Sequence, residues 1–316
     1  MPKVKIEIKN TDQLINRLGT FLKEQVINWR LANRNYFNLK KSKIKLFNVN
    51  NFEFEVAFLP DRVKSTTASV DKKSLQSREC FLCEDNLPAE QDILFFRNFN
   101  FLVNPYPIFE RHFTIAFNRH IKQSIANSIS QLLFFAKELG STFALFYNGP
   151  ECGASAPDHL HFQMCKKNDI PIVRKILAEN FIATDKHILI NNFPQAIILK
   201  NSKCELLEQS FLKLIEAIKK NSNINSEPKL NLISFRRCED IYLIIFLRAK
   251  HRPNRFFLDG ENQILLSPAA VDMGGRLILP REKDFEKMNA ELIKEIFDEV
   301  SLSTSNFRKI ISTLNF

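Results

Sequence analysis

The sequence lacks the features of a secreted or membrane-embedded protein. Its first thirty residues carry charges throughout and contain no uninterrupted apolar stretch of the kind found in a signal peptide. No later segment approaches the run of about eighteen apolar residues that a transmembrane helix requires. We therefore expect a soluble, cytoplasmic protein without a membrane partner.

Glycine and cysteine are also scarce. Only seven of the 316 residues are glycine, so glycine-rich low-complexity sequence is excluded. The six cysteines, without a secretion signal, favour reduced thiols or a metal site over a disulfide framework. They stand at positions 80, 83, 152, 165, 204 and 238.

The chain has no run of basic residues interleaved with aromatic ones, as single-strand nucleic-acid platforms do. Its 45 Lys and Arg against 35 Asp and Glu nevertheless give a formal net charge of +10, spread along the chain. Such a balance attracts anions over long range. Nucleotides and sugar phosphates are the expected ligands, and a nucleic-acid partner is the less favoured alternative.

The apolar content, 45% of residues, is sufficient for one large core or two modest ones. Residues 11–40 carry a helical apolar period with Thr11 as the expected N-cap, and alternation over residues 44–59 predicts a strand. The next unit is predicted to run strand, turn, strand, helix, strand, loop, strand. Its helix spans about 121–139 and ends at Gly140, and its strands read NFLVNP, HFTIAF, FALFYN and HLHFQ.

A weaker echo of this unit follows between residues 230 and 253. Two strand-like runs are again separated by a polar turn, and HFTIAFNRH can be compared with IYLIIFLRAKH. We interpret the echo as an internal duplication whose second copy is degenerate, because it has no His-x-His pair. The predicted fold is α+β, with antiparallel sheets flanked by helices in two halves, residues 1–220 and 221–316, that form one compact unit.

The segment with the strongest chemical signal covers residues 153–163, Gly-Ala-Ser-Ala-Pro-Asp-His-Leu-His-Phe-Gln. Side chains two apart in an extended segment point to the same side, so His159, His161 and Gln163 are expected to form a polar row. A neutral imidazole can attack a phosphate ester while neighbouring donors hold the phosphate oxygens. The alternative is a pair of ordinary strand histidines, one buried and one exposed.

This segment resembles the active-site segment of the histidine-triad (HIT) superfamily. The likeness is carried by residues 146–149 (Phe-Tyr-Asn-Gly), the small-residue loop and the row itself, with HFTIAFNRHI resembling the preceding strand. Glutamine in place of a third histidine is similar to the nucleotidyltransferase and phosphorylase branch, which includes galactose-1-phosphate uridylyltransferase, diadenosine tetraphosphate phosphorylase and GDP-L-galactose phosphorylase. The string His-Leu-His-Phe-Gln is most similar to the last of these, and residues 267–285 resemble an uncharacterised bacterial relative. Asp158 departs from the Pro or Asn of other branches.

The resemblance implies two HIT-like halves and a role for each residue of the segment. His161 would be the nucleophile that takes a nucleoside monophosphate covalently, and Gln163 and Ser155 would donate hydrogen bonds to its oxygens. A glutamine amide binds anions but cannot shuttle a proton, which favours phosphate or a sugar phosphate over water as the acceptor. The candidate catalytic residues are His161, Gln163, His159 and Ser155, with Asn148 and Gly149 shaping the phosphate cradle.

Cys80 and Cys83 have the C-x-x-C spacing with which two thiolates can bind one zinc ion. Buried thiols or a redox pair are the alternatives. The resemblance to the uridylyltransferase supplies His120 and His159 as the two further ligands of a structural zinc site. No organic cofactor is expected.

Two basic stretches are candidates for binding the phosphates of the substrate. The polar loop 60–78 contains Arg62 and Lys64, and a second concentration of positive charge contains Arg236 and Arg252. Solvated surface charge is the alternative for each of them.

These observations predict a nucleotidyl phosphorylase or transferase. Its substrate would be a nucleoside-diphosphate sugar, with a GDP-hexose favoured, or a dinucleoside polyphosphate, and its intermediate a nucleotidyl-histidine. The alternatives are a hydrolase that uses the same histidine and a module that binds nucleotide or nucleic acid without turnover. The expected partners are the nucleotide and phosphate, and a homodimer is left open.

Overall fold

One mixed sheet runs through most of the molecule in the computed structural model, which describes residues 3–67, 72–179, 187–190, 194–222, 224 and 226–312. Its strand order is β1-β4-β5-β6-β8-β7-β11-β12-β10-β9, and a second sheet has the order β13-β3-β2. All described pairings are antiparallel except β1 with β4 and β13 with β3. The strands are β1 (Lys5–Glu7), β2 (Lys43–Val49), β3 (Phe52–Phe58), β4 (Ile93–Phe96), β5 (Phe99–Val103), β6 (Phe113–Phe117), β7 (Phe143–Asn148), β8 (His161–Lys166), β9 (His187–Ile190), β10 (Ala196–Asn201), β11 (Leu230–Arg237), β12 (Asp240–Leu247) and β13 (Arg276–Leu279).

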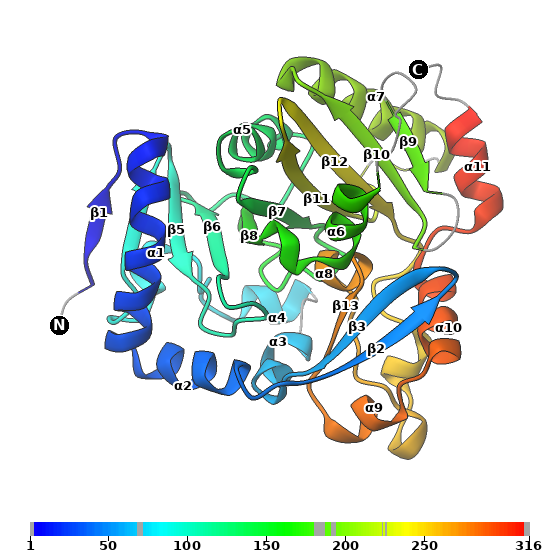
Figure 1. The fold of residues 1–316 in the computed structure, drawn as a ribbon, viewed down its shortest axis with the longest axis horizontal. Helices are drawn as coiled ribbons and strands as arrows, with labels where there is room; N and C mark the ends of the chain where they lie inside the picture. Colours follow the sequence, from blue (N-terminus) through cyan, green and yellow to red (C-terminus); the bar gives the residue numbers. More distant parts are fainter. Residues whose placement is uncertain are drawn as a thin grey trace.

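Helices and the small sheet cover the two faces of the large sheet (Figure 1). Helices α1, α5, α7 and α11 pack on one face, while α6, α8, α10 and the small sheet pack on the other. None of the described helices is long and apolar enough to cross a membrane. The α-helices are α1 (Thr11–Asn28), α2 (Arg30–Leu39), α3 (Val63–Thr66), α4 (Lys72–Gln76), α5 (Ile129–Leu139), α6 (Pro171–Ala178), α7 (Cys204–Ser222), α8 (Ala270–Met273), α9 (Glu282–Lys287), α10 (Ala290–Val300) and α11 (Thr304–Ser312).

The internal duplication is visible in the order of elements. The run β5-β6-α5-β7-β8 is repeated as β9-β10-α7-β11-β12, and the strands lie as β5-β6-β8-β7 in one copy and β9-β10-β12-β11 in the other. By this topology β12 corresponds to β8, so the comparison of its sequence with β6 was wrong. The predicted α+β class is confirmed. Two strands of the second copy precede residue 220, and the division of the chain there stays a prediction.

The period-2 pattern of the strands separates the apolar core from the polar face. In β8, Phe162 and Met164 enter the core under α1 and α5, whereas His161 and Gln163 point to the opposite face. The same alternation places Ile115 of β6 in that core. The polar row is therefore on the face covered by α8 and the small sheet.

Several local expectations differ from the structure. Helix α5 begins at Ile129 rather than near residue 121. The alternating stretch 44–59 is a hairpin of two strands, because Asn50 and Asn51 turn the chain with φ of 50° and 62°. The cap of α1 is Asn10 rather than Thr11, since the Asn10 side chain accepts a hydrogen bond from the Gln13 amide. None of these differences changes the topology that positions the polar face.

Candidate active site

A cavity of about 440 Å³ lies on the polar face of the large sheet, over β5, β6, β8 and β7. The start of α2, the 3-10 turn and helix α3 after β3, the β5–β6 loop, the cysteine loop and the α8–β13 segment complete its walls. Its lining includes apolar and aromatic side chains as well as amides and hydroxyls. The lining residues are Trp29, Leu31, Arg62, Thr66, Phe81, Leu82, Pro88, Gln91, Leu102, Asn104, Pro105, Tyr106, Ile108, Thr114, Phe146, Asn148, Gly153, Ser155, His161, Gln163, Ser267, Ala269, Val271, Asp272 and Ile278.

His161 lines this cavity, with only 4% of its surface exposed. Its Nδ1 lies 2.8 Å from the carbonyl oxygen of His159, and because a carbonyl only accepts, Nδ1 carries the proton. Burial, partly opposed by this hydrogen bond, lowers the pKa of His161 to about 4. The ring is therefore neutral at pH 7, and its Nε2 keeps a free lone pair.

The buried side chain of Gln123 fixes the backbone on both sides of the cavity floor. Its Oε1 accepts from the His161 amide at 2.8 Å, and its Nε2 donates to the carbonyls of Asn148 and His161, each at 3.0 Å. Strands β7 and β8 stop pairing at Phe146 and Gln163. Gln123 thus bridges the point at which the two strands diverge, which holds Asn148 and His161 in register.

Gln163 lies beside His161 on β8 and also lines the cavity. Its Oε1 is 2.8 Å from Nε2 of the fully buried His112. The structure therefore brings together the candidate nucleophile and the candidate amide, and it adds a histidine that was not among the candidates.

Asn148 presents its amide to the cavity from the end of β7. Its Oδ1 accepts from the side chain of Asn231 at 3.0 Å and from the backbone amide of Ala270 at 2.8 Å. Asn231 Oδ1 in turn accepts from the buried guanidinium of Arg248 at 2.6 Å. With both oxygen positions occupied, the NH₂ of Asn148 is left as a donor for a ligand.

The small-residue loop lies against the second half of the chain. Ser155 lines the cavity, as does Gly153, whose φ of +90° and close approach to Ala269 require glycine. Gly149 does not line the cavity. It packs against the Leu230 carbonyl, which a Cβ would approach to 2.7 Å, so its smallness serves the packing of β7 against β11.

The predicted basic residues are distributed unequally. Arg62 lines the cavity: it donates to the Tyr106 carbonyl at 2.7 Å, while its buried Nε has no protein partner. Among the described lining residues it is the one cationic side chain. Burial lowers its pKa to about 10, so it stays charged at neutral pH. Arg252 lies one layer behind the wall, where it donates to Ser267 Oγ at 3.1 Å and to the Thr66 carbonyl at 3.2 Å.

Arg236 is not brought to the cavity. It lies toward the far end of β11, five residues from Asn231, which corresponds to about 17 Å of extended strand. Its backbone amide donates to the carbonyl oxygen of Gly140 at the end of α5. The side chain of Lys64 lies outside the described part of the chain.

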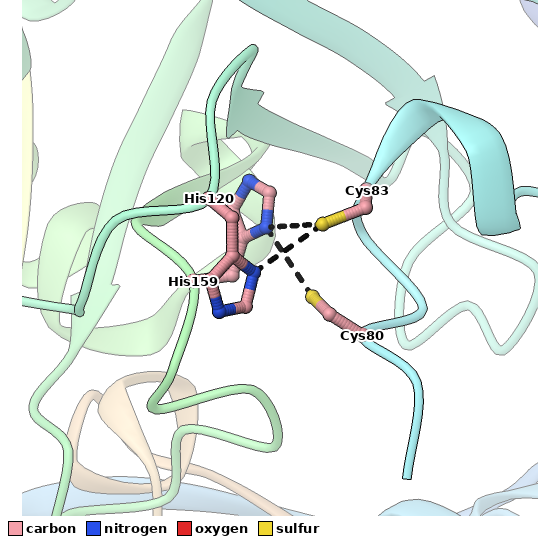
Figure 2. Close-up of side chains that lie close together, drawn as sticks. All are labelled: Cys80, Cys83, His120 and His159. Atoms are coloured by element: carbon pink, nitrogen blue, oxygen red, sulfur yellow. Dashed lines mark hydrogen bonds between the residues drawn. The ribbon is translucent and has the colours of Figure 1, made fainter.

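Cys80, Cys83, His120 and His159 converge beside the cavity (Figure 2). Their ligand atoms all lie within 4.8 Å of one another, with Nδ1 of His159 3.3 Å from the Cys80 sulfur and Nδ1 of His120 3.3 Å from the Cys83 sulfur. His159 therefore differs from the expected row: it precedes β8, and its ring faces the thiols rather than the cavity.

The donor set of this cluster fits a zinc ion. Tetrahedral zinc with bonds of about 2.0–2.3 Å separates neighbouring N and S ligands by about 3.6 Å, close to the spacing found here. His159 Nε2 lies 2.7 Å from the Phe117 carbonyl, which places the ring proton there and leaves Nδ1 free for a metal. Arg78 pairs with Asp158 at 3.0 Å and so ties the cysteine segment to the small-residue loop.

The remaining thiols near the row do not compete with His161. Cys152 is buried, and burial raises its pKa to about 11, so its reactive thiolate is disfavoured. Cys165 points from β8 into the core beneath α6. The residues that sequence reasoning missed are His112, Gln123, Asn231, Trp29, Gln91 and Asp272.

Two family models match successive parts of the chain. Residues 21–166 match a domain of unknown function, DUF4922, and residues 188–314 match the GDPGP1-like C-terminal domain. No curated protein shows significant sequence similarity to the chain.

Among solved structures, the chain is similar to yeast Ap4A phosphorylase Apa2. The complex with AMP is 13% identical, with 90% of this chain and 97% of that chain covered and a TM-score of 0.57. The complex with Ap4A is 12% identical, with 87% and 97% covered and a TM-score of 0.53. At this identity the likeness establishes the fold. This fold is the one that the predicted resemblance to diadenosine tetraphosphate phosphorylase implies, and the match to the GDPGP1-like model agrees with the predicted likeness of the C-terminal part.

Proposed function

We propose that this chain is a nucleotidyl phosphorylase or transferase that works through a covalent nucleotidyl-His161 intermediate. The observation that carries the proposal is the placement of His161: its Nδ1–H is held by the His159 carbonyl, and the ring lines a cavity next to the Gln163 amide. A neutral imidazole with one nitrogen free is a competent nucleophile toward phosphorus.

The reaction has two displacements. In the first, the Nε2 lone pair of His161 attacks the α-phosphorus, an N–P bond forms, and the P–O bond to the leaving group breaks. The leaving group departs as an anion and needs no proton. In the second, an oxygen of inorganic phosphate attacks the same phosphorus, the N–P bond breaks and its electron pair returns to Nε2.

The polar wall supplies the donors for these steps. Gln163, Ser155 and the NH₂ of Asn148 hold the non-bridging oxygens of the nucleotidyl group. Arg62, whose buried Nε has no protein partner, binds the phosphate that leaves or enters. The charge of the site is thus matched to a substrate with at least two phosphate groups.

The substrate we propose is a nucleoside-diphosphate sugar, with a GDP-hexose favoured, or a dinucleoside polyphosphate. A volume of about 440 Å³ lies within the usual range of ligand sites, and the aromatic lining residues Trp29, Phe81 and Tyr106 suit a nucleobase. The GDPGP1-like match and the His-Leu-His-Phe-Gln string support the GDP-sugar. The likeness to a phosphorylase crystallised with Ap4A supports the second class.

We also propose that Cys80, Cys83, His120 and His159 hold a structural zinc ion. Bound there, zinc would fix the cysteine loop to the strand that carries His161, and it takes no part in the displacements. The residues of the chain that bind and transfer the nucleotidyl group are those of the cavity.

The decisive experiment uses α-³²P-labelled nucleotides. The purified chain is incubated with GDP-sugars, UDP-sugars and dinucleoside polyphosphates, with and without inorganic phosphate. We expect phosphate-dependent formation of a nucleoside diphosphate and, without acceptor, an acid-labile label on the protein that His161→Ala abolishes. Product formation that is independent of phosphate would indicate the hydrolase, and absence of label with every donor would indicate a binding module.

A further inference from the structure

His112 is a buried histidine that the two displacements do not use. It stands immediately before β6, its side chain has no exposed surface, and it lies on the same face of the sheet as Gln163. Both of its ring nitrogens have partners: Nδ1 is 3.2 Å from the backbone nitrogen of Ile108, and Nε2 is 2.8 Å from Oε1 of Gln163.

The chemistry of these partners fixes the direction of both hydrogen bonds. A backbone N–H only donates, so Nδ1 of His112 must accept from Ile108 and carries no proton. The proton of the neutral ring is therefore on Nε2, which donates to the Gln163 oxygen. A doubly protonated ring would direct an N–H at the Ile108 amide, and burial together with the charge of Arg62 lowers the pKa of His112 to about 3.

This chain of bonds sets the orientation of the Gln163 amide. With Oε1 engaged by His112, the NH₂ group is the part of the amide left for the cavity that Gln163 lines. No group in the described residues accepts a hydrogen bond from that NH₂. The NH₂ of Gln163 is therefore available to donate a hydrogen bond to a bound anion.

We propose that His112 is a positioning residue that locks Gln163 as a hydrogen-bond donor, so that the site selects an anionic acceptor over water. The inference rests on the proposed function and specifies its acceptor. Phosphate attacks without losing a proton, whereas an attacking water must pass one to an acceptor. The amide oxygen of Gln163, which would otherwise orient that water, is occupied by His112.

Three variants test the proposal: His112→Phe keeps a ring but removes the donor, His112→Gln supplies an amide N–H at the position of Nε2, and Gln163→Ala removes the residue that is positioned. We expect His112→Phe to lower kcat for phosphorolysis by about 10- to 100-fold with little change in KM, and to raise the share of hydrolysis. His112→Gln should recover most of the activity and the selectivity for phosphate. In the Gln163→Ala background, His112→Phe should cause no further loss.

Several outcomes would overturn the proposal. If His112→Phe lowers kcat by the same factor in the Gln163→Ala background as in the wild-type chain, His112 acts through packing alone. If His112→Phe leaves both kcat and the ratio of phosphorolysis to hydrolysis unchanged, the orientation of the Gln163 amide does not depend on His112. Circular dichroism and melting temperature identify a variant that has not folded.

A second measurement requires no activity assay and no known substrate, because it reads the tautomer of His112 directly. In the ¹⁵N-histidine-labelled wild-type chain, His112 should show the Nε2–H tautomer from about pH 5 to 8, with its signal assigned by its loss in His112→Gln. The Nδ1–H tautomer, or a cationic ring, would refute the lock. This readout stands if the wild-type chain forms no nucleotidyl enzyme, so failure of the proposed function and failure of the lock are distinguishable.

Discussion

The carbonyl oxygen of His159 accepts a hydrogen bond from Nδ1 of His161 at 2.8 Å, while the ring of His159 faces the sulfur of Cys80 at 3.3 Å. One residue therefore connects the metal-ligand cluster with the candidate nucleophile. Its side chain belongs to the cluster and its peptide group sets the tautomer of His161. A substitution in the cluster should consequently lower the rate of the reaction, although Cys80, Cys83 and His120 do not line the cavity.

The first prediction concerns the metal. Elemental analysis should find about one zinc per chain, and Cys80→Ser should lose it, because one of four ligands is gone. The variant should melt at a lower temperature and turn over nucleotide more slowly, since the position of His159 is no longer fixed. Cys238→Ser, the same change at an exposed cysteine, is the control. A wild-type chain without metal, or a Cys80→Ser chain with full metal and activity, would contradict this prediction.

The second prediction concerns the amide of Gln163. Gln163→Ala removes one donor to the charge that develops on the phosphoryl oxygens, and loss of one such donor lowers kcat by about 10²- to 10³-fold. The melting temperature should change little because the side chain is part-exposed to the cavity. Steady-state kinetics checks the result, with Gln131→Ala on α5 as the control, a glutamine on the opposite side of the sheet. A fall of less than threefold in kcat would remove Gln163 from the chemistry.

Much of the fold could be predicted because its signals are local. The apolar alternation of β5, β6, β7 and β8 and the period of α5 are each contained in a short window of sequence. The hairpin at Asn50 and Asn51 was missed because its turn has no glycine or proline, and the break in alternation there is only one residue long.

The candidate site could be predicted only where residues share a motif. His161 and Gln163 stand in one strand, and the resemblance supplied the four metal ligands, which are up to 79 positions apart in the chain. His112, Gln123 and Asn231 gave no signal, because each is a single polar residue whose role depends on a partner between 38 and 83 residues away. Arg236 was misplaced because a charge at the end of a predicted strand does not tell which end faces the site.

The third prediction concerns pH. The pKa of His112 is depressed by burial to about 3 from an unfolded value of about 6.5, so the unfolded chain binds the additional proton in that interval. The free energy of unfolding therefore contains a contribution that is complete above about pH 6.5 and decreases as the pH falls, by at most about 1.4 kcal/mol per pH unit. His112→Gln cannot titrate and lacks this contribution.

Chemical denaturation of both proteins between pH 4.5 and 8 checks the sign. The difference in unfolding free energy, wild type minus His112→Gln, should rise with pH up to about 6.5 and then stay constant. A constant difference over the whole range would mean that His112 titrates alike in the folded and unfolded chain.

The fourth prediction concerns Gly153, where the small-residue loop approaches α8. Its φ is +90°, and a Cβ there would lie 2.7 Å from the Cβ and 3.0 Å from the Cα of Ala269. Gly153→Ala should cost about 1–3 kcal/mol of stability from the backbone conformation, in addition to the contact. Because Gly153 and Ser155 both line the cavity, displacement of the loop should also raise KM for the nucleotide.

Gly19→Ala is the matched control. This glycine lies inside α1 with no atom within 4 Å of the added Cβ, so the change should stabilise the helix by about 0.5–1 kcal/mol and leave KM unaltered. Equal effects of the two substitutions on stability and KM would show that the loop accommodates a side chain at position 153. The close approach to Ala269 would then not be needed to shape the cavity wall.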